Sequence, residues 1–407
     1  MVSEVGIVFS MNSKYDEVKV YAETIEDEAI SQITSIANSP LGEDAHIRIV
    51  PDAHAGKGCV IGTTMKFNGK VCPNIVGVDI GCGVVAYRLA KRASEIDVKQ
   101  FDEVCRRIVV SGQSVRNKAL YQSAQELILS DLYCWNYLKN HERLYKSLGT
   151  LGGGNHYIEL NKDSDDTLWL VVHSGSRNLG KQVAEWYQKR AEQITVDDHL
   201  ALRADLIESL KMQGRQDEIE AELAKVPRRP ETGLEYLEGG NVRDYLHDMK
   251  ICQEWASDNR RIIAEELIKT MNWGYTNIVE SIHNYIDIEN QIIRKGAISA
   301  QKDEICLIPL NMRDGTLLCV GKGNEDWNYS APHGAGRLMS RSKAKQEVSL
   351  EAFKDSMKDV YYSTVCEATI DESPFAYKDM EEIMRAVEPT VEIYERLIPI
   401  YNYKATN

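Results

Sequence analysis

Two potential metal ligands, Asp79 and Cys82, lie three residues apart within the glycine-rich segment 76–83. Three histidines have similar glycine-rich or polar neighbours: His156, His173 and His283. Carboxylates and imidazoles are costly to bury without a partner, and together with a thiol they are a typical set of metal ligands. The thiolate and the imidazoles favour zinc if ligand chemistry alone is considered, and a thiolate can bridge two ions. The sequence therefore predicts a metal centre built from these five side chains.

The alternative for each of these residues is an ordinary place in the hydrophobic core. A single cysteine or histidine is more often packed there than bound to a metal, and the chain lacks the compact paired spacing of structural zinc sites. Seven further cysteines are interpreted in this way: Cys59, Cys72, Cys105, Cys134, Cys252, Cys306 and Cys319. Four histidines are expected at the surface or in helices: His46, His141, His199 and His247.

The local setting of the ligands suggests how they are held. Residues 76–79 are interpreted as the end of a strand, and the following glycines permit a sharp turn. His173 likewise ends an apolar run. Ser174 and Ser176 are expected to orient the ring of this histidine through hydrogen bonds, and Asn284 the ring of the histidine before it.

His333 differs from the other histidines because Pro332 stiffens the chain before it and Gly334 and Gly336 leave space around it. An imidazole in that position could be a metal ligand, a general base or a covalent nucleophile, and the residue types alone do not decide. Arg337 follows closely and favours a role at a phosphoryl group, where negative charge must be neutralised.

Three short glycine segments could bind phosphate through their backbone N–H groups: residues 56–58, 152–154 and 321–323. None matches a P-loop or dinucleotide motif, and glycine pairs usually mark ordinary turns. Basic side chains between residues 294 and 345 could also face phosphate groups. They are Arg294, Lys295, Lys322, Arg337, Arg341, Lys343 and Lys345. For Lys343 and Lys345 the alternative is a solvent-exposed helix face.

The composition indicates a large globular protein of the reducing cytoplasm. The 407 residues include 43% hydrophobic and 27% charged residues, which is enough for a sizeable core. The net charge of −14 argues against a general nucleic-acid coat but leaves room for a local basic cleft. The nine cysteines show no disulfide-like spacing, and the chain begins without a secretory leader. No apolar run is long enough to cross a membrane, so we expect a cytoplasmic protein without a membrane partner.

Stretches rich in strand formers alternate with helical stretches. Strand-forming residues dominate residues 46–89 and 148–180, and they recur near 305–308 and 316–320. Helical patterns are found in residues 92–147, 181–226 and 241–272. Residues 195–198 resemble a helix-capping box, Gly214 and Pro227 are expected to end helices, and 227–230 to form a turn. The tail after residue 350 is predicted to be mainly helical and to end in a strand.

The candidate ligands fall in the strand-rich stretches, with helices between them. This pattern predicts an α+β fold in which β-sheets converge on a central metal cleft and helical segments flank it. We predict one domain over residues 1–407, with a helical insertion at about 181–240. The chain shows no internal repeat.

Taken together, these motifs resemble the RtcB family of RNA-splicing ligases. The resemblance covers most of the chain, from about residue 51 to residue 341, with a short match at the C-terminus. Seven segments carry it in order: residues 51–58, 78–83, 154–159, 173–177, 283–284, 294–297 and 333–337. The resemblance implies one RtcB-like ligase domain.

The resemblance also implies a reaction and a metal. Members of this family use GTP and manganese to join RNA ends with a 2′,3′-cyclic phosphate or 3′-phosphate to 5′-hydroxyl ends. By motif match, Asp79, Cys82 and His156 would bind one manganese ion. Cys82, His173 and His283 would bind the second, so Cys82 would bridge the two. The family thus implies manganese where ligand chemistry favours zinc, and we follow the family and expect zinc to compete.

The nucleotide site is implied in the same way. His333 would bind GMP covalently, and Asp52 would assist catalysis beside the metal site. Asn155 and Glu159 would contact the guanylate, and Lys404 would lie near the guanine. The remaining nucleotide-binding positions are Gly334, Ala335 and Gly336. Residues 308–315 depart from the Pro-Gly-Ser-Met-Gly form of many members, which puts nucleotide contacts from that loop in question.

Other activities of the same site are open at this stage. A guanylyltransferase could cap 3′-phosphate ends without sealing them, and a non-catalytic protein could bind RNA ends. A metal-dependent phosphohydrolase would explain the ligands but not Arg337 or the motif around Asn155. The expected partners are GTP, RNA with the stated ends and, in some members, an archease-like activator protein.

Overall fold

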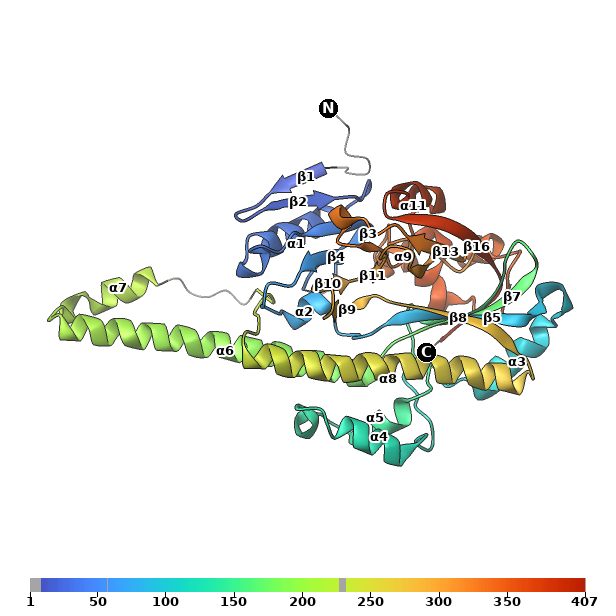
Figure 1. Ribbon diagram of the computed structural model, residues 1–407, viewed down its shortest axis with the longest axis horizontal. Coiled ribbons are helices and arrows are strands. Elements are labelled where there is room, and N and C mark those ends of the chain that lie inside the picture. Colours follow the sequence, from blue (N-terminus) through green and yellow to red (C-terminus); the bar gives the residue numbers. More distant parts are fainter. Residues whose placement is uncertain (1–8, 57, 227–231, 407) are drawn as a thin grey trace.

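Two β-sheets built from distant parts of the chain form the centre of the molecule, and helices flank them (Figure 1). The structure is a computed structural model that describes residues 9–56, 58–226 and 232–406. The larger sheet has the strand order β12-β13-β16-β6-β7-β5-β8, with β15 beside β16. Its strands are β5 (Gly83–Arg92), β6 (Tyr157–Lys162), β7 (Thr167–Ser174), β8 (Tyr275–Ile282), β12 (Ile305–Pro309), β13 (Thr316–Gly321), β15 (Tyr361–Tyr362) and β16 (Val391–Lys404).

The second sheet has six strands in the order β1-β2-β3-β4-β10-β9, and a separate pair joins β11 to β14. These strands are β1 (Phe9–Asn12), β2 (Glu17–Val20), β3 (Arg48–His54), β4 (Ile61–Lys66), β9 (Asn284–Asp287), β10 (Ile292–Lys295), β11 (Ala297–Ser299) and β14 (Ser330–Pro332). A single residue, His283, separates β8 of the large sheet from β9 of the second sheet. The mixed α+β class predicted from the sequence is confirmed.

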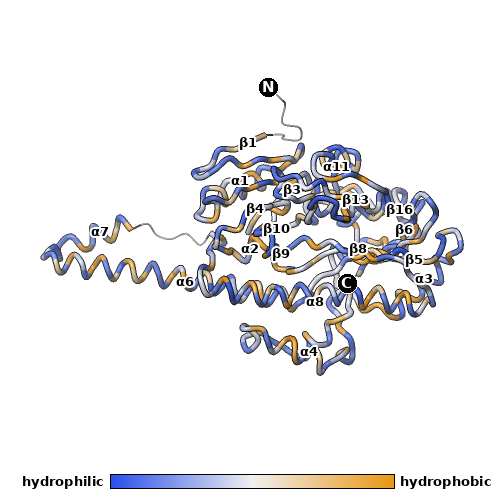
Figure 2. The backbone as a smooth tube through the Cα atoms, viewed as in Figure 1, coloured by the Kyte–Doolittle hydropathy of each residue, from blue (hydrophilic) through white to orange (hydrophobic). Residues whose placement is uncertain are grey.

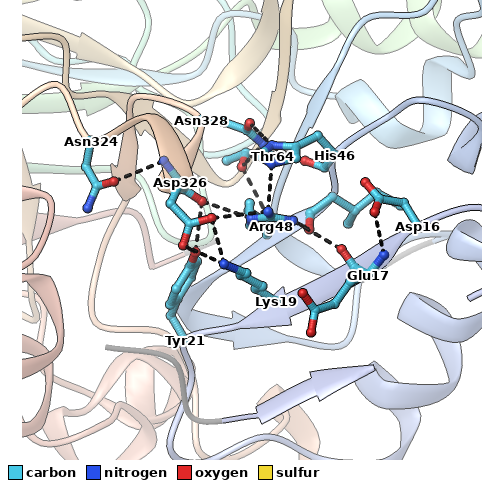
Figure 3. A network of polar contacts seen from close by, with 11 residues as sticks. Asp16, Glu17, Lys19, Tyr21, His46, Arg48, Thr64, Asn324, Asp326 and Asn328 are labelled. Carbon is cyan, nitrogen blue, oxygen red and sulfur yellow. Dashed lines mark hydrogen bonds and ion pairs between the residues drawn. The ribbon is translucent and has the colours of Figure 1, made fainter. Parts of the chain in front are cut away.

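A polar network fastens the second sheet to a segment far along the chain (Figure 3). The carboxylate of Asp326, in the short 3₁₀ helix η5 (Glu325–Trp327), accepts hydrogen bonds from Lys19 Nζ at 3.0 Å and Tyr21 Oη at 3.0 Å. It also pairs with the buried Arg48 at 3.2 Å. His46 belongs to this half-buried network, with Arg48 Nη2 2.7 Å from its Nε2, so the expectation of a surface histidine is wrong here.

Several strand ends meet at one edge of the large sheet. Strand β5 is antiparallel to β7 and β8, and β6 is antiparallel to β7 and β16. Gly83 at the start of β5 is therefore opposite Ser174 and Ile282, and Tyr157 at the start of β6 is opposite Lys404. The register collects residues at this edge whatever their distance in sequence.

The central strand β7 is buried on both faces, which explains its continuous apolar run. Leu170 and Val172 pack in one cluster with Ile263 of α8 (Gly240–Thr270), whereas Trp169 and Val171 pack in another cluster on the opposite face. Apolar residues recur along the helices and through the central strands, with polar residues between them (Figure 2). This alternation lets one side of each helix cover a sheet.

The helices are of very different lengths. The α-helices besides α8 are α1 (Asp27–Ala37), α2 (Pro73–Val76), α3 (Val98–Ile108), α4 (Gln122–Leu129), α5 (His141–Ser147), α6 (Arg177–Met212), α7 (Ile219–Lys225), α9 (Arg341–Glu347), α10 (Leu350–Ser356) and α11 (Met380–Val387). The 3₁₀ helices besides η5 are η1 (Pro40–Gly42), η2 (Ala93–Glu95), η3 (Trp135–Tyr137), η4 (Gln216–Glu218), η6 (Glu367–Glu372) and η7 (Pro374–Ala376). Helix α8 packs against β5 and β7, whereas the outer part of α6 and α7 extend away from the sheets (Figure 1).

The structure corrects two local predictions and confirms others. Residues 195–198 do not cap a helix, because α6 continues through them; no glycine or proline between residues 181 and 212 interrupts it. Residues 76–79 are not a strand end: α2 ends at Val76, and a turn follows. Gly214 follows the end of α6 with φ +71°, as a helix-ending glycine should. Pro227 and the predicted turn at 227–230 lie outside the described residues.

Candidate active site

The predicted metal ligands meet at the shared edge of the large sheet. Cys82 directly precedes β5, His156 directly precedes β6, His173 is the penultimate residue of β7, and His283 directly follows β8. Asp79 lies in the turn before Cys82, whose backbone N–H donates to the Asp79 carbonyl at 3.1 Å. The antiparallel register thus explains why residues about two hundred positions apart come together.

Cys82 is at the centre of this group. Its Sγ lies 3.5 Å from His156 Nε2 and 3.3 Å from His173 Nε2, and the three buried side chains can share one metal ion. Asp79 Oδ2 lies 3.2 Å from His156 Nε2. The ring of His283 is centred 5.3 Å from that of His173. The five predicted ligands are therefore neighbours, and Cys82, His156 and His173 form a candidate metal site.

Backbone carbonyls turn two of the histidines toward this group. His156 Nδ1 lies 2.9 Å from Leu151 O, and His173 Nδ1 lies 3.2 Å from Asn155 O. Since a carbonyl oxygen only accepts, each Nδ1 must carry the proton, and each Nε2 keeps a lone pair directed at Cys82. This is the tautomer that a metal ligand requires, so the donor set fits a metal ion.

The electrostatics of the group agree with metal binding. Burial holds the pKa of His173 and of His283 well below the ordinary value, so both rings are neutral near pH 7. Burial alone would raise the pKa of Asp79, but the neighbouring His156 side chain lowers it below its ordinary value. Burial, and then the charge of Asp79, raise the pKa of the Cys82 thiol well above its usual range. A bound cation would be needed to stabilise the thiolate.

The supporting hydrogen bonds differ from those predicted. Ser176 N–H donates to Asp79 Oδ1 at 3.1 Å, so this serine orients the carboxylate and not the His173 ring. Ser174 Oγ donates to Leu151 O at 2.8 Å, the carbonyl that faces His156. Asn284 Nδ2 donates to the Asp79 carbonyl at 3.2 Å and holds the turn, not the neighbouring histidine ring.

A buried arginine, which the sequence did not reveal, braces the two ligand loops. Arg260 of α8 donates from Nη1 to Gly81 O at 2.7 Å and to Ser174 O at 2.8 Å. Its side chain is inaccessible to solvent and pairs with Glu280 at 2.8 Å. The guanidinium therefore fixes the segment before Cys82 relative to the end of β7.

A cavity of about 530 Å³ adjoins the metal group. Its wall includes His173 of the metal group, and also Arg337, Glu372 and Tyr377. All the residues predicted to bind nucleotide line it: Asn155, Glu159, His333, Gly334, Ala335, Gly336 and Lys404. They come from β6, the turn before it, the loop after β14 and the last residue of β16. The cavity has the volume expected for a small-molecule site.

His333 lies between the cavity and the metal group. Its ring is centred 4.8 Å from that of His283, and its Nδ1 lies 2.6 Å from Asp52 Oδ2. Asp52 is fully buried on β3, and this close contact falls outside hydrogen-bond geometry. Asp52 therefore occupies the Nδ1 side of the His333 ring.

Glu159 forms a polar cluster at the base of the cavity. Asn402 Nδ2 donates to Glu159 Oε1 at 2.6 Å, as the register of β16 and β6 requires. Burial raises the pKa of Glu159 to about 7, against the opposing effects of Asn402 and Lys404. This carboxyl group therefore titrates near neutral pH.

Glu372 of η6 is a second buried acid in the wall, and the sequence did not single it out. Its carboxylate lies 3.1 Å from Lys404 Nζ and 2.5 Å from Arg341 Nη1, and it accepts a hydrogen bond from Tyr377 Oη at 2.8 Å. Burial opposes ionisation, but Lys404, Arg341 and Arg337 together lower the pKa of Glu372 to about 2. The residue remains charged and fixes three cavity side chains. The sequence does not indicate this role of Glu372, because all of these partners except Tyr377 are remote along the chain.

The basic residues between 294 and 345 do not form one phosphate-facing patch. Arg294 is buried and pairs with Asp287 at 2.9 Å, whereas Lys322 Nζ donates to Glu388 O. Arg337 and Arg341 line the cavity, and Lys343 pairs with Glu347 on the exposed side of α9, as the alternative interpretation expected.

The three glycine segments lie in different surroundings. Gly56 lines the cavity, but Lys57 lies outside the described residues. Gly152, with φ +91°, packs against the Arg177 guanidinium. Gly323 packs against Lys302 and does not belong to the described cavity wall.

The divergent loop remains part of the cavity despite its altered sequence. Its contributions are Pro309, Leu310, Asn311, Met312 and Gly315. Asp314 turns away to accept hydrogen bonds from Asn311 Nδ2 at 2.7 Å and Arg313 Nη2 at 2.8 Å. The loop is thus held by its own side chains and presents Asn311 to the cavity.

Comparison with known proteins agrees with this site. A family model described as "tRNA-splicing ligase RtcB" matches residues 32–136 and 135–405. The chain belongs to the RtcB family. RNA-splicing ligase RtcB of Escherichia coli strain K12 is 32% identical over 412 aligned residues, which cover 91% of this chain and 92% of the relative. The tRNA-splicing ligase RtcB of Aeropyrum pernix is 27% identical, over 88% of this chain and 87% of the relative.

The resemblance inferred from the motifs is thereby confirmed, because RtcB relatives align with nearly the whole chain. In the part of the chain that the structure describes, no helix is both long and apolar enough to span a bilayer. All nine cysteines lie in that part and are free, and the seven assigned to the core are buried.

Proposed function

We propose that this RtcB-family chain is a GTP- and manganese-dependent RNA ligase, which joins 2′,3′-cyclic phosphate or 3′-phosphate ends to 5′-hydroxyl ends. The observation that supports it most directly is the position of His333, between a candidate metal group and a cavity lined by Asn155, Glu159 and Lys404. A nucleotide in this cavity would place its phosphates beside both His333 and the metal ligands. We propose one ligase domain over residues 1–407, with a helical insertion at about 181–240 that contains most of α6 and all of α7.

The metal ligands have the following proposed roles. Asp79, Cys82 and His156 hold one manganese ion, and Cys82, His173 and His283 hold a second. The contacts of Cys82 Sγ with both His156 and His173 support a bridging thiolate. When bound, the ions neutralise charge on phosphoryl oxygens during transfer. Zinc, which prefers the same thiolate and imidazole ligands, is expected to compete.

In the proposed first step, His333 Nε2 attacks the α-phosphorus of GTP. An N–P bond forms, the bond from this phosphorus to the oxygen shared with the β-phosphate breaks, and pyrophosphate leaves. Asp52 keeps the proton on Nδ1 and stabilises the positive charge that the ring acquires. Arg337 and Arg341 in the cavity wall can neutralise phosphate oxygens.

The remaining steps transfer this activation to RNA. A cyclic phosphate is first opened by water to a 3′-phosphate, one of whose oxygens attacks the phosphorus on His333. The N–P bond breaks, and its electron pair returns to Nε2. The 5′-hydroxyl oxygen then attacks the activated 3′-phosphorus, GMP leaves, and the hydroxyl proton passes to solvent.

The other cavity residues are proposed to bind the nucleotide. Asn155, at the exposed edge before β6, contacts the guanylate, as does Glu159 deeper in the wall. Lys404 lies near the base. Backbone groups of Gly334, Ala335 and Gly336 accommodate the phosphate.

Incubation with labelled GTP and manganese, followed by denaturation, tests the nucleophile. We expect label on the wild type, none on His333→Ala, and wild-type label on His141→Ala, whose histidine lies in α5 outside the site. Label that survives in His333→Ala would contradict the assignment.

A gel with 3′-phosphate and 5′-hydroxyl oligonucleotides then separates the possible outcomes. Joined RNA supports the ligase, whereas activated but unjoined 3′ ends indicate a guanylyltransferase. RNA binding without any GMP transfer indicates a non-catalytic RNA-end protein. We further propose cytoplasmic action, where the nine free cysteines would stay reduced. Addition of an archease-like protein to the assay tests for an activator.

A further inference from the structure

Lys378 is a buried lysine behind the His333–Asp52 pair, and none of the proposed steps uses it. The residue is 2% exposed and lies between η7 and α11. It does not belong to the described cavity wall, so it cannot touch a nucleotide there. Lysine is rarely buried unless its charge has a partner.

The contacts of Lys378 link three segments around the catalytic pair. Nζ donates to Thr24 O at 2.5 Å and to Pro51 O at 2.7 Å, and Pro51 directly precedes Asp52 on β3. The backbone N–H of Lys378 donates to Gly336 O at 3.1 Å, in the loop that carries His333. One residue therefore holds both the strand of the acid and the loop of the nucleophile.

Strand β3 and the loop that carries His333 are in close contact. A β-carbon at Gly336 would lie 2.4 Å from Asp52 O, and this glycine has φ +74°. Gly336 therefore lies directly against the backbone of Asp52, with no room for a side chain between the loop and β3. A displacement of Pro51 would pass directly to the Asp52–His333 contact.

The charge of Lys378 also lies near the buried carboxylate of Asp52. Asp52 is fully buried, and neither carboxylate oxygen has an aligned hydrogen bond. Such a carboxylate is costly to ionise unless positive charge is near. Burial lowers the pKa of Lys378, and Asp52 is the first of the carboxylates that oppose this effect, before Glu382, Glu26 and Glu23. The positive charge of Lys378 therefore lies near the buried carboxylate of Asp52.

We propose that Lys378 is a positioning residue for the guanylylation of His333, acting through Asp52. Its hydrogen bond to Pro51 fixes the strand, and its ammonium places positive charge near the buried carboxylate that faces Nδ1 of His333. This inference rests on the proposed function, because it needs His333 to be the nucleophile.

Single-turnover labelling of the purified full-length protein with GTP and manganese tests the inference. The variants are Lys378→Met, which removes charge and hydrogen bonds, and Lys378→Gln, which removes the charge but can still donate to Pro51 O. Lys322→Met is the matched control, since Lys322 Nζ also donates to a backbone carbonyl but lies outside the cavity wall.

The labelling rate constant reports positioning, whereas the labelled fraction reports how much protein is folded. We expect the rate constant to fall about 10- to 100-fold in both Lys378 variants, because small misplacement of a catalytic pair has effects of this size. The half-saturating GTP concentration should change less than about threefold. Lys322→Met should behave as the wild type.

A double-mutant cycle asks whether Lys378 acts through Asp52. We expect Asp52→Asn combined with Lys378→Gln to be no slower than Asp52→Asn alone. Additive losses, or a reduced labelled fraction with an unchanged rate constant, would overturn the inference and leave Lys378 a purely structural residue. If Lys378→Met does not fold, the labelling rate constant of Lys378→Gln decides the question in the same way. A wild type that takes no label refutes the proposed function instead.

Discussion

The titration of Glu159 gives a prediction that needs neither nucleotide nor metal. Burial raises the pKa of this carboxyl group in the folded protein to about 7, compared with an ordinary value of 4.5. Between these two pH values the unfolded chain releases a proton that the folded protein keeps. Folding is therefore favoured less as the pH rises, and the loss is complete above the folded-state pKa. At ~1.4 kcal/mol per pH unit, the total contribution is about 3 kcal/mol.

Glu159→Gln should remove this pH dependence, because an amide does not ionise. The quantity to compare is the free energy of unfolding of the variant minus that of the wild type. This difference should be larger at pH 8 than at pH 4.5 by about 3 kcal/mol. A constant offset is expected from altered hydrogen bonds with Asn402, and it cancels in the comparison.

Urea denaturation across that pH range, followed by circular dichroism, measures the difference. Glu254→Gln on α8 is the matched control, since Glu254 is exposed to solvent and lies outside the cavity wall. If the Glu159→Gln difference is constant with pH, Glu159 does not titrate with a raised pKa, and the argument from burial is wrong.

Three further substitutions test the site. Gly336→Ala should reduce the rate of His333 labelling at least about tenfold, because its β-carbon would lie 2.4 Å from Asp52 O. Gly334→Ala should have a milder effect, because its β-carbon would lie 3.1 Å from the nearest atom. Equal labelling rates for the two variants would contradict this. Cys82→Ala should lower manganese affinity more than about 100-fold in equilibrium dialysis, compared with no change for the buried Cys59→Ala; unchanged binding would remove Cys82 from the ligand set. Arg260→Met should cost about 3–5 kcal/mol in urea denaturation because it removes a fully buried guanidinium that donates to Gly81 O and Ser174 O and pairs with Glu280, and the half-exposed Arg261→Met should cost under ~1 kcal/mol. Similar losses for both arginines would show that burial does not decide the cost.

Much of the fold followed from local patterns. The apolar run that ends at His173 became a buried strand, and the strand-rich stretches became β3 to β5 and β6 to β7. The capping-box prediction at 195–198 failed because a capping box starts a new helix only where the preceding helix has ended, and nothing interrupts α6 before these residues. The interpretation of residues 76–79 as a strand end failed because proline at the first position favours a short helix, which α2 adopts.

The roles of supporting residues were less predictable. Ser174, Ser176 and Asn284 were correctly identified as neighbours of the ligands, but each holds a different partner from the one predicted. A side-chain hydrogen bond depends on orientation within a few ångströms, whereas sequence proximity fixes only the neighbourhood. Glu372, Arg260 and Lys378 gave no signal, because charged residues are common and their burial is invisible in a sequence.

The sequence by itself determined the chemical inventory of this protein: a carboxylate, a thiol and three histidines with metal-binding potential, and a histidine framed by glycines beside an arginine. Their types and flanking glycines are local properties, so one chain could reveal them. Only the tertiary structure decided that Cys82 contacts two histidines, that Asp52 faces His333, and that Lys378 joins their segments. The physical reason is that strand register and burial set these contacts. Both depend on how remote segments pair, which no local pattern specifies.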